Sequence, residues 1–274
     1  MKKVLPILKE GLNDDEKRAE LNYIVTNVPI LYKYTRIESF KAIVSNSSII
    51  FKNPTLFNDP YDCKPTLINF EFVPTNFRQY LIEKYKPALT PEIIQRVENS
   101  SDNDVVSAFR DLAFPIELSN TAISCFSEKF DNLLMWSHYS NAHKGVCIGF
   151  DLKKLYSAIE SYHPALIKVK YTNEFVQTEY FTNTKEAIGN WYRIKSECWS
   201  YENEIRIVLT NLKLNSAKQI NIPISKESIS SIYLGYNLES EDESHIRSIS
   251  AEQLPGAKVL KMRLQNDSFN LFPE

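Results

Sequence analysis

The sequence predicts an α+β fold with a mixed or antiparallel central sheet. Short apolar runs rich in Val, Ile and Phe recur along the 274 residues, and amphipathic segments of unequal length separate them. Regular parallel winding would instead alternate strands with helices of similar length. The 43% hydrophobic content is enough for a sizeable core, so we expect one domain over residues 1–274.

Composition narrows the classes of function. The net charge of −2 disfavours strong non-specific binding to nucleic acid, although a local basic groove stays open. The 6 glycines form neither a P-loop nor a G-x-G-x-x-G pattern. Pro6, Lys9 and Glu10 interrupt the N-terminal apolar patch, and no run of about 18 apolar residues occurs. We therefore expect a cytoplasmic protein that makes no membrane contact.

The N-terminal part predicts a helix from Asn13 to about Tyr23 and then a strand–helix–strand unit. Its strands span 30–34 and 48–52, and its helix spans 36–44. In the helix, Thr35 is the expected N-cap and Glu38 completes a capping box.

The loop 53–63 and a helical insertion follow. Prolines, Asn and Asp make 53–63 a structured loop. Residues 70–117 carry helical patterns, one beginning at Pro91 and one over 104–112, and carry no chemical motif. We interpret 70–117 as a covering or lid segment within the domain.

The stretch Thr121–Asp151 combines two predicted core strands with a polar connection. The strands are 122–126 and 146–150, and Asp131 is the expected cap of a helix over 132–139. Further helices are expected at 152–162, 182–194 and 240–251, and further strands at 167–171, 204–209, 219–222, 229–234 and 258–264.

Lys33 is the first candidate binding residue. It shares a strand face with Leu31, while Tyr32 and Tyr34 share the other face. Such a cation can bind a phosphate or a ribose edge. The alternative is a lysine on an exposed edge strand.

The loop and the central stretch supply further candidates. Asn58, Asp59 and Asp62 can position a substrate or a metal, or can satisfy the backbone of their own loop. His138 and His143 are five residues apart, which does not suit zinc on one helix face, so no metal is expected. The polar and aromatic candidates of the stretch are Ser124, Ser127, Trp136, His138 and Tyr139. Two alternatives remain for this group. Ser127 and His138 can pair as nucleophile and base, or the polar side chains simply hydrogen-bond the loop to the sheet.

Glu202 and Glu204 form the acidic candidate pair. Residues two apart in an extended chain face the same side, and Arg206 follows on that face. Carboxylates held together require a cation, or a partner that becomes cationic in the reaction, such as an oxocarbenium sugar. The alternative is a Glu–Arg ladder on the surface of an edge strand.

Four motifs carry a resemblance to a known family. LYKYT, FNDPYDC, the 121–151 stretch and K-x-x-x-W-x-x-E-x-E-x-R (Lys195 to Arg206) resemble, in order, a bacterial family known as domain of unknown function 2971. The resemblance covers roughly Ile30 to Leu264. That family is similar to abortive-infection, or phage-defence, proteins.

The N-terminal strand–helix–strand unit and the E-x-E motif also resemble ADP-ribosyltransferases, more remotely. This resemblance implies NAD as substrate, with Lys33 on the nicotinamide-side ribose and Glu204 on the ribose 2′-hydroxyl and the oxocarbenium. It implies that Glu202 orients the acceptor. Ser124 or Ser127 would support the glutamate, and Tyr34, Trp136 or Tyr139 would stack on nicotinamide, with His138 also in the cofactor-binding set.

Three hypotheses of function follow. The first is ADP-ribosyl transfer to an unidentified protein or nucleic acid, or NAD hydrolysis, in phage defence or as a toxin; Glu204→Gln should then abolish activity and spare folding. The second is a non-catalytic sensor or interaction module whose FNDPYDC loop and MWSHY segment bind a phage or host partner. The third is a nuclease or metal hydrolase using Asp59, Asp62, His138 and Glu204, which requires the loop to lie against the E-x-E strand.

Overall fold

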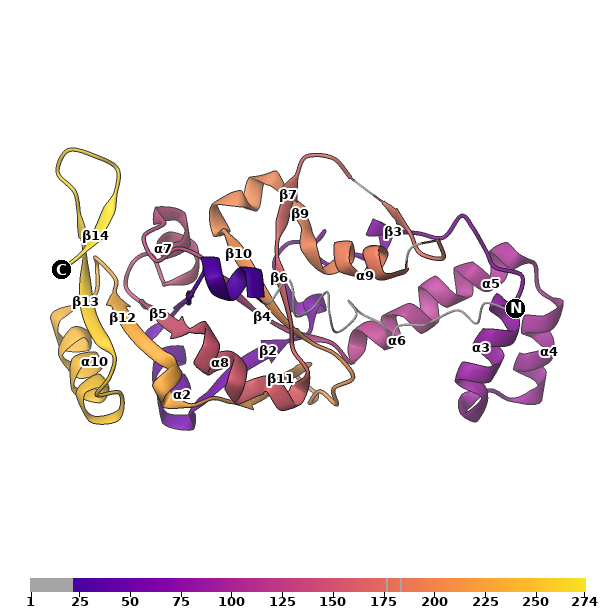
Figure 1. Cartoon of the computed structure of the whole chain (residues 1–274), viewed down its shortest axis with the longest axis horizontal. Helices are drawn as coiled ribbons and strands as arrows, with labels where there is room; N and C mark the ends of the chain where they lie inside the picture. The colour runs from indigo at the N-terminus through magenta and orange to yellow at the C-terminus, as the bar shows by residue number, and fades with distance from the viewer. Residues whose placement is uncertain (1–21, 176, 183) are drawn as a thin grey trace.

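A ten-stranded sheet runs through the middle of the molecule (Figure 1). The computed structural model describes residues 22–175, 177–182 and 184–274. The strands of this sheet are β1 (Ile30–Thr35), β2 (Ser48–Lys52), β4 (Ala122–Ser127), β5 (Val146–Asp151), β6 (Ala165–Lys168), β10 (Glu204–Leu209), β11 (Gln219–Pro223), β12 (Ile229–Leu234), β13 (Lys258–Leu264) and β14 (Leu271–Pro273). Within it β12 and β13 pair in parallel and the other pairs are antiparallel, which confirms the predicted mixed, mostly antiparallel α+β fold.

The sheet branches at β4, which positions the candidate site. Its main path is β11-β2-β4-β1-β5-β12-β13-β14, and β10 and then β6 continue from β4. Along one edge β4 pairs with β10 over six residues. On the other edge it meets β1 only at Tyr32↔Ser127 and β2 only at Lys52↔Ile123. β1 and β2 therefore diverge from β4, and we call the opening between these two pairs the fork.

Helices cover both faces of the sheet. They are α2 (Ile37–Asn46), α3 (Phe77–Tyr85), α4 (Pro91–Asn99), α5 (Asp102–Ala108), α6 (Phe114–Ser119), α7 (Leu133–Tyr139), α8 (Leu152–Ile159), α9 (Thr184–Arg193) and α10 (Ser240–Gln253). Helices α2 and α8 join the largest core cluster with Leu31 of β1 and Ile148 of β5. Helix α7 joins a second cluster with Tyr34 and Cys147, which alternate with those residues and so lie on the opposite face.

The insertion forms a helical end of the molecule. Helices α3 to α6 lie at the end opposite α10 and the β13–β14 hairpin (Figure 1). Their apolar side chains build a third cluster that includes Phe77 and Phe109 from the insertion and Trp191 from α9. Two short parallel pairs, β3 (Ile68–Asn69) with β8 (Thr178–Glu179) and β7 (Lys170–Thr172) with β9 (Ile194–Ser196), complete this region.

Several local predictions need correction. The capping box at Thr35 is wrong, because Arg36 is the N-cap of α2 and has no capping side-chain bond. Helix α7 is capped by Asn132, whose side chain accepts from Leu134 N and Met135 N, and not by Asp131. The strand predicted over 167–171 is two strands, β6 and β7, with different partners. Of the helix predicted from Asn13, most lies outside the described residues, and 22–27 are helical.

Candidate functional site

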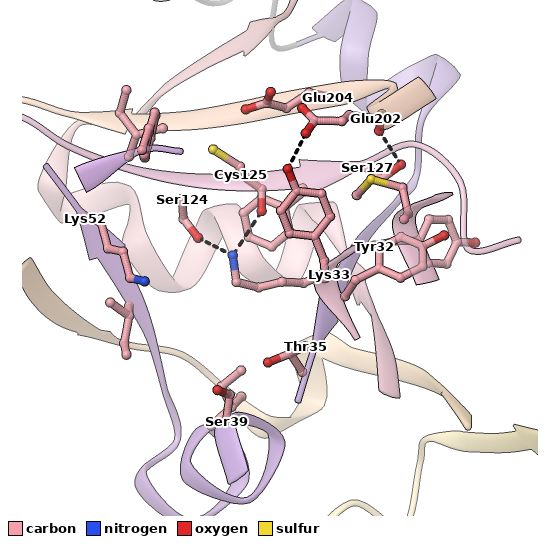
Figure 2. A pocket seen from close by; sticks show the side chains of 18 of the residues that line it. Tyr32, Lys33, Thr35, Ser39, Lys52, Ser124, Cys125, Ser127, Glu202 and Glu204 are labelled. Carbon is pink, nitrogen blue, oxygen red and sulfur yellow. Dashed lines mark hydrogen bonds between the residues drawn. The ribbon is translucent and has the colours of Figure 1, made fainter. Parts of the chain in front are cut away.

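A pocket of about 780 Å³ occupies the fork. Its lining comes from β1, β2 and β4, from α2 and α7 on the two faces of the sheet, from the 56–62 loop, and from Lys195, Glu202 and Glu204. Figure 2 shows Lys33, Ser124, Ser127, Glu202 and Glu204 around the same space. Most of the predicted site residues, although far apart in sequence, therefore meet in one cavity of a size typical for ligand sites.

Lys33 of β1 bridges to β4 at the fork, where these two strands diverge. Its Nζ donates to Ser124 Oγ at 3.0 Å and to the carbonyl oxygen of Cys125 at 2.9 Å (Figure 2). Burial lowers the pKa of Lys33 to about 8, and the nearby charge of Lys52 adds to this effect. Because β1 lies between β4 and β5, the alternative of a lysine on an exposed edge strand is wrong.

The acidic pair belongs to a buried charge network. Lys195 Nζ lies 2.5 Å from Glu202 Oε2 and 3.0 Å from Glu204 Oε2. Arg206 donates through Nε to Glu204 at 2.8 Å and through both Nη atoms to Asp62 at 2.7 Å. Since β10 lies between β4 and β6 and all its residues are buried, the surface Glu–Arg ladder is wrong.

The backbone that brings Glu202 and Glu204 together is not an extended strand. Glu202 ends a 3₁₀ helix (Glu197–Glu202), and Asn203 has the left-handed φ of 45° before β10 begins. Asn and Asp tolerate this conformation better than most residues. Ser127 fixes the turn by donating from Oγ to the Glu202 carbonyl oxygen at 2.6 Å (Figure 2). The carboxylates thus converge through Lys195, with Ser127 holding the main chain.

The two glutamates differ electrostatically. Burial alone would raise the pKa of Glu204, but Arg206 and Lys195 outweigh it and hold that pKa well below the usual range. For Glu202, burial and the charge of Glu204 raise the pKa despite Lys195. Three carboxylates, Asp62 included, face two cations, so one negative charge is in excess.

Aromatic and polar residues connect Glu202 to the surface. The Tyr139 hydroxyl donates to Glu202 Oε1 at 2.5 Å, and Asn58 Nδ2 lies 3.5 Å from that hydroxyl. His138 Nδ1 lies 3.0 Å from the Tyr201 hydroxyl. The MWSHY helix and the FNDPYDC loop therefore both contribute to the wall beside Glu202.

Some candidates lie elsewhere. Trp136 is fully buried, donates from Nε1 to the Phe130 carbonyl oxygen at 2.7 Å, and does not line the pocket. Asp59 is buried in its loop, where Oδ1 accepts from Tyr61 N at 2.9 Å. Among the described side chains of 70–117, none lines the pocket, and the lid role of this segment stays a prediction. Tyr34 does line the pocket and donates to the Lys129 carbonyl oxygen at 2.8 Å.

Three further residues lie at the site without a site role predicted from sequence: Lys195, Lys52 and Tyr201. Lys195 was visible in the K-x-x-x-W-x-x-E-x-E-x-R spacing, whereas Lys52 ends a short strand without a distinguishing pattern. The loop does lie against the E-x-E strand, as the metal-hydrolase hypothesis requires, but Arg206 stands between Asp62 and Glu204. Among the described residues, no group of three or more His, Cys, Asp or Glu is arranged to hold a metal ion.

Comparison with known proteins adds one finding. The family model described as "Protein of unknown function (DUF2971)" matches residues 135–207. The matched segment runs from α7 into β10 and contains Tyr139, Lys195, Glu202, Glu204 and Arg206. No curated protein matches the chain. Within the described part of the chain, no helix has the length and apolar character needed to cross a bilayer.

Proposed function

We propose that the pocket binds NAD and that the protein cleaves its nicotinamide–ribose bond, passing ADP-ribose to an acceptor or to water. The resemblance to abortive-infection proteins suggests phage defence, or toxin activity, as the setting. The observation that carries the proposal is Glu202, a buried carboxylate in the pocket wall with one excess negative charge around it.

The excess negative charge around Glu202 can stabilise the transition state in which the nicotinamide–ribose bond breaks. The C1′–N bond breaks with its electron pair leaving on nicotinamide, which departs neutral, and the ribose becomes an oxocarbenium ion. A carboxylate stabilises the positive charge only as it develops, which lowers the barrier and not merely the energy of the bound substrate. Water or an acceptor hydroxyl or carboxylate then bonds to C1′, and an attacking water or hydroxyl releases its proton.

The geometry favours Glu202 over Glu204 for contact with the ribose. Both Glu204 oxygens are held by Arg206 and Lys195. Glu202 accepts a hydrogen bond from the Tyr139 hydroxyl on one oxygen and from Lys195 on the other. A ribose hydroxyl can replace the Tyr139 hydroxyl as the donor to Glu202. In this proposal Glu204 positions Lys195, and Lys195 positions Glu202.

The test is nicotinamide release from NAD, followed by chromatography, for wild type and Glu202→Gln. We expect release by wild type and a loss of at least roughly a hundredfold in the variant, as for removal of one charge-stabilising group. Glu197→Gln is the matched control, because Glu197 is exposed in the same 3₁₀ helix and does not line the pocket. No release by wild type at millimolar NAD, or equal rates in Glu202→Gln, would refute the proposal.

One observation favours a second function, a binding module without turnover. All four oxygens of Glu202 and Glu204 already have partners, which suits a network that shapes a pocket. Near the loop, Tyr61 and Phe175 are 56% and 54% exposed and pack edge to face, a surface suited to a partner. This function predicts that NAD raises the melting temperature without nicotinamide release, and that Tyr61→Ala weakens capture of the partner.

A further inference from the structure

The end of the pocket away from the acidic pair carries a second lysine. Lys52 is the last residue of β2, at the point where β2 leaves β4. Figure 2 shows its ammonium group on the opposite side of the fork from Lys33, with both side chains directed into the space beside Ser124. Two cations from two diverging strands therefore face one region of the pocket.

Neither lysine has a carboxylate partner in the part of the chain that the structure describes. The side chain of Lys33 donates to neutral oxygens, those of Ser124 and Cys125, and within the described residues the side chain of Lys52 makes no hydrogen bond or ion pair. The remaining acid in this part of the lining is Glu38, which is exposed on α2. The acids at the other end are neutralised mainly by Lys195 and Arg206. The two ends of the pocket thus differ in charge, with Lys33 and Lys52 at one end and the acidic pair at the other.

We propose that Lys33 and Lys52 form an anion subsite that binds the diphosphate of a nucleotide. Two lysines on separate strands suit a group with two linked phosphates, because each ammonium can take one phosphate as a charge-assisted partner. The hydroxyls of Ser39 and Ser124 and the Asn221 amide also line the pocket and offer further donors. A diphosphate relieves the repulsion between the lysines, which adds to the larger effect of burial in lowering the pKa of Lys33.

The subsite fixes the direction of the ligand. With its diphosphate at the lysine end, a dinucleotide extends one ribose toward Glu202 and Tyr139, which line the same pocket. The negative phosphates are then kept away from the excess negative charge of the acidic pair. The choice of a nucleotide rests on the proposed function, whereas diphosphate binding itself is measurable without turnover.

The experiment is titration calorimetry of inorganic pyrophosphate into the full chain at low salt, because salt screens such contacts. Lys52→Gln should weaken binding at least roughly tenfold, which is the weight of one charge-assisted bond. Lys153→Gln is the control, since Lys153 is exposed on α8, outside the pocket, and the substitution removes the same charge. Lys52 is itself exposed, so its substitution should leave folding intact, and a circular dichroism melt checks this.

Further ligands separate the possible outcomes. The affinity for ADP should fall in Lys52→Gln as the affinity for pyrophosphate does. The affinity for nicotinamide riboside, which lacks phosphate, should not change. No pyrophosphate binding to wild type at millimolar concentration, or equal weakening by Lys153→Gln, overturns the subsite. Pyrophosphate and ADP binding without NAD cleavage supports the subsite and rejects the proposed function. NAD cleavage that is indifferent to Lys52→Gln keeps the proposed function and rejects the subsite.

Discussion

Glu204→Gln is expected to destabilise the protein severely, so it does not isolate a catalytic role. Glu204 is 3% exposed, and its oxygens accept from Arg206 Nε at 2.8 Å, Arg206 Nη2 at 3.2 Å and Lys195 Nζ at 3.0 Å. A glutamine keeps one acceptor oxygen but turns an N–H₂ group toward a cation. Fully buried Arg206 is then left with Asp62 as its carboxylate partner. The sequence alone suggested that this substitution would spare folding, and the structure leads to the opposite expectation.

The size of the effect follows from two opposing contributions. Each cation near 4 Å contributes about 4 kcal/mol of attraction at an effective dielectric of about 20. Loss of two such attractions is partly offset, because repulsion from Glu202 and Asp62 is relieved and a neutral side chain costs less to bury. Breaking a buried ion pair from one side typically costs about 3–5 kcal/mol, and we expect this range. It is a large part of the stability of a typical domain, about 5–15 kcal/mol.

Urea unfolding followed by tryptophan fluorescence measures this change. Trp136 and Trp191 are both buried and should report the transition. Glu197 is exposed in the 3₁₀ helix that precedes β10. The free energy of unfolding of Glu197→Gln should therefore stay within about 0.5 kcal/mol of wild type. A Glu204→Gln protein within about 1 kcal/mol of wild type would show that the network contributes little and would refute the reasoning.

Two further predictions concern pH and packing. Because burial raises the pKa of Glu202, nicotinamide release should increase as pH rises through a value above the usual glutamate pKa, and the contribution of Glu202 to folding stability should decrease over the same interval. A pH–rate profile and thermal melts of wild type and Glu202→Gln across this pH interval check both signs. A rate that stays constant down to the ordinary glutamate pKa would contradict the prediction. Gly145→Ala should cost about 1–3 kcal/mol in urea unfolding, because a Cβ at this position would lie 2.3 Å from the Thr35 carbonyl oxygen and 2.9 Å from that of Ser140. Gly189→Ala, where a Cβ meets nothing within 4 Å, is the matched control, and equal stabilities of the two variants would contradict the close packing.

Sequence patterns predicted the elements better than their long-range contacts. Strand alternation correctly separated Lys33 and Leu31 from Tyr32 and Tyr34, because that pattern is local. The pairing of Asp62 with Arg206 joins residues 144 apart, and no spacing rule reports such a contact. The fork depends on single pairs between β4 and two other strands, which composition does not encode.

The candidate site shows the same division. The expected meeting of Glu202 and Glu204 occurs, but a left-handed Asn203 and Lys195 produce it, and not an extended strand. Trp136 could not be separated from Tyr139 in the sequence, since aromatic residues serve cores and pockets alike. In the structure Trp136 packs in the core and Tyr139 lines the pocket.

The incomplete pairing of β4 also makes main chain available for recognition. Ile123 and Ser127 pair across the edge that faces the fork, so Cys125, midway between them, presents its peptide groups to the same side. Lys33 donates a hydrogen bond to the carbonyl oxygen of Cys125. The Cys125 N–H is directed into the fork, where a ligand oxygen can accept from it. Such a contact is the same for any non-proline residue at this position, so side chains around the pocket can change ligand preference while this part of the recognition is kept.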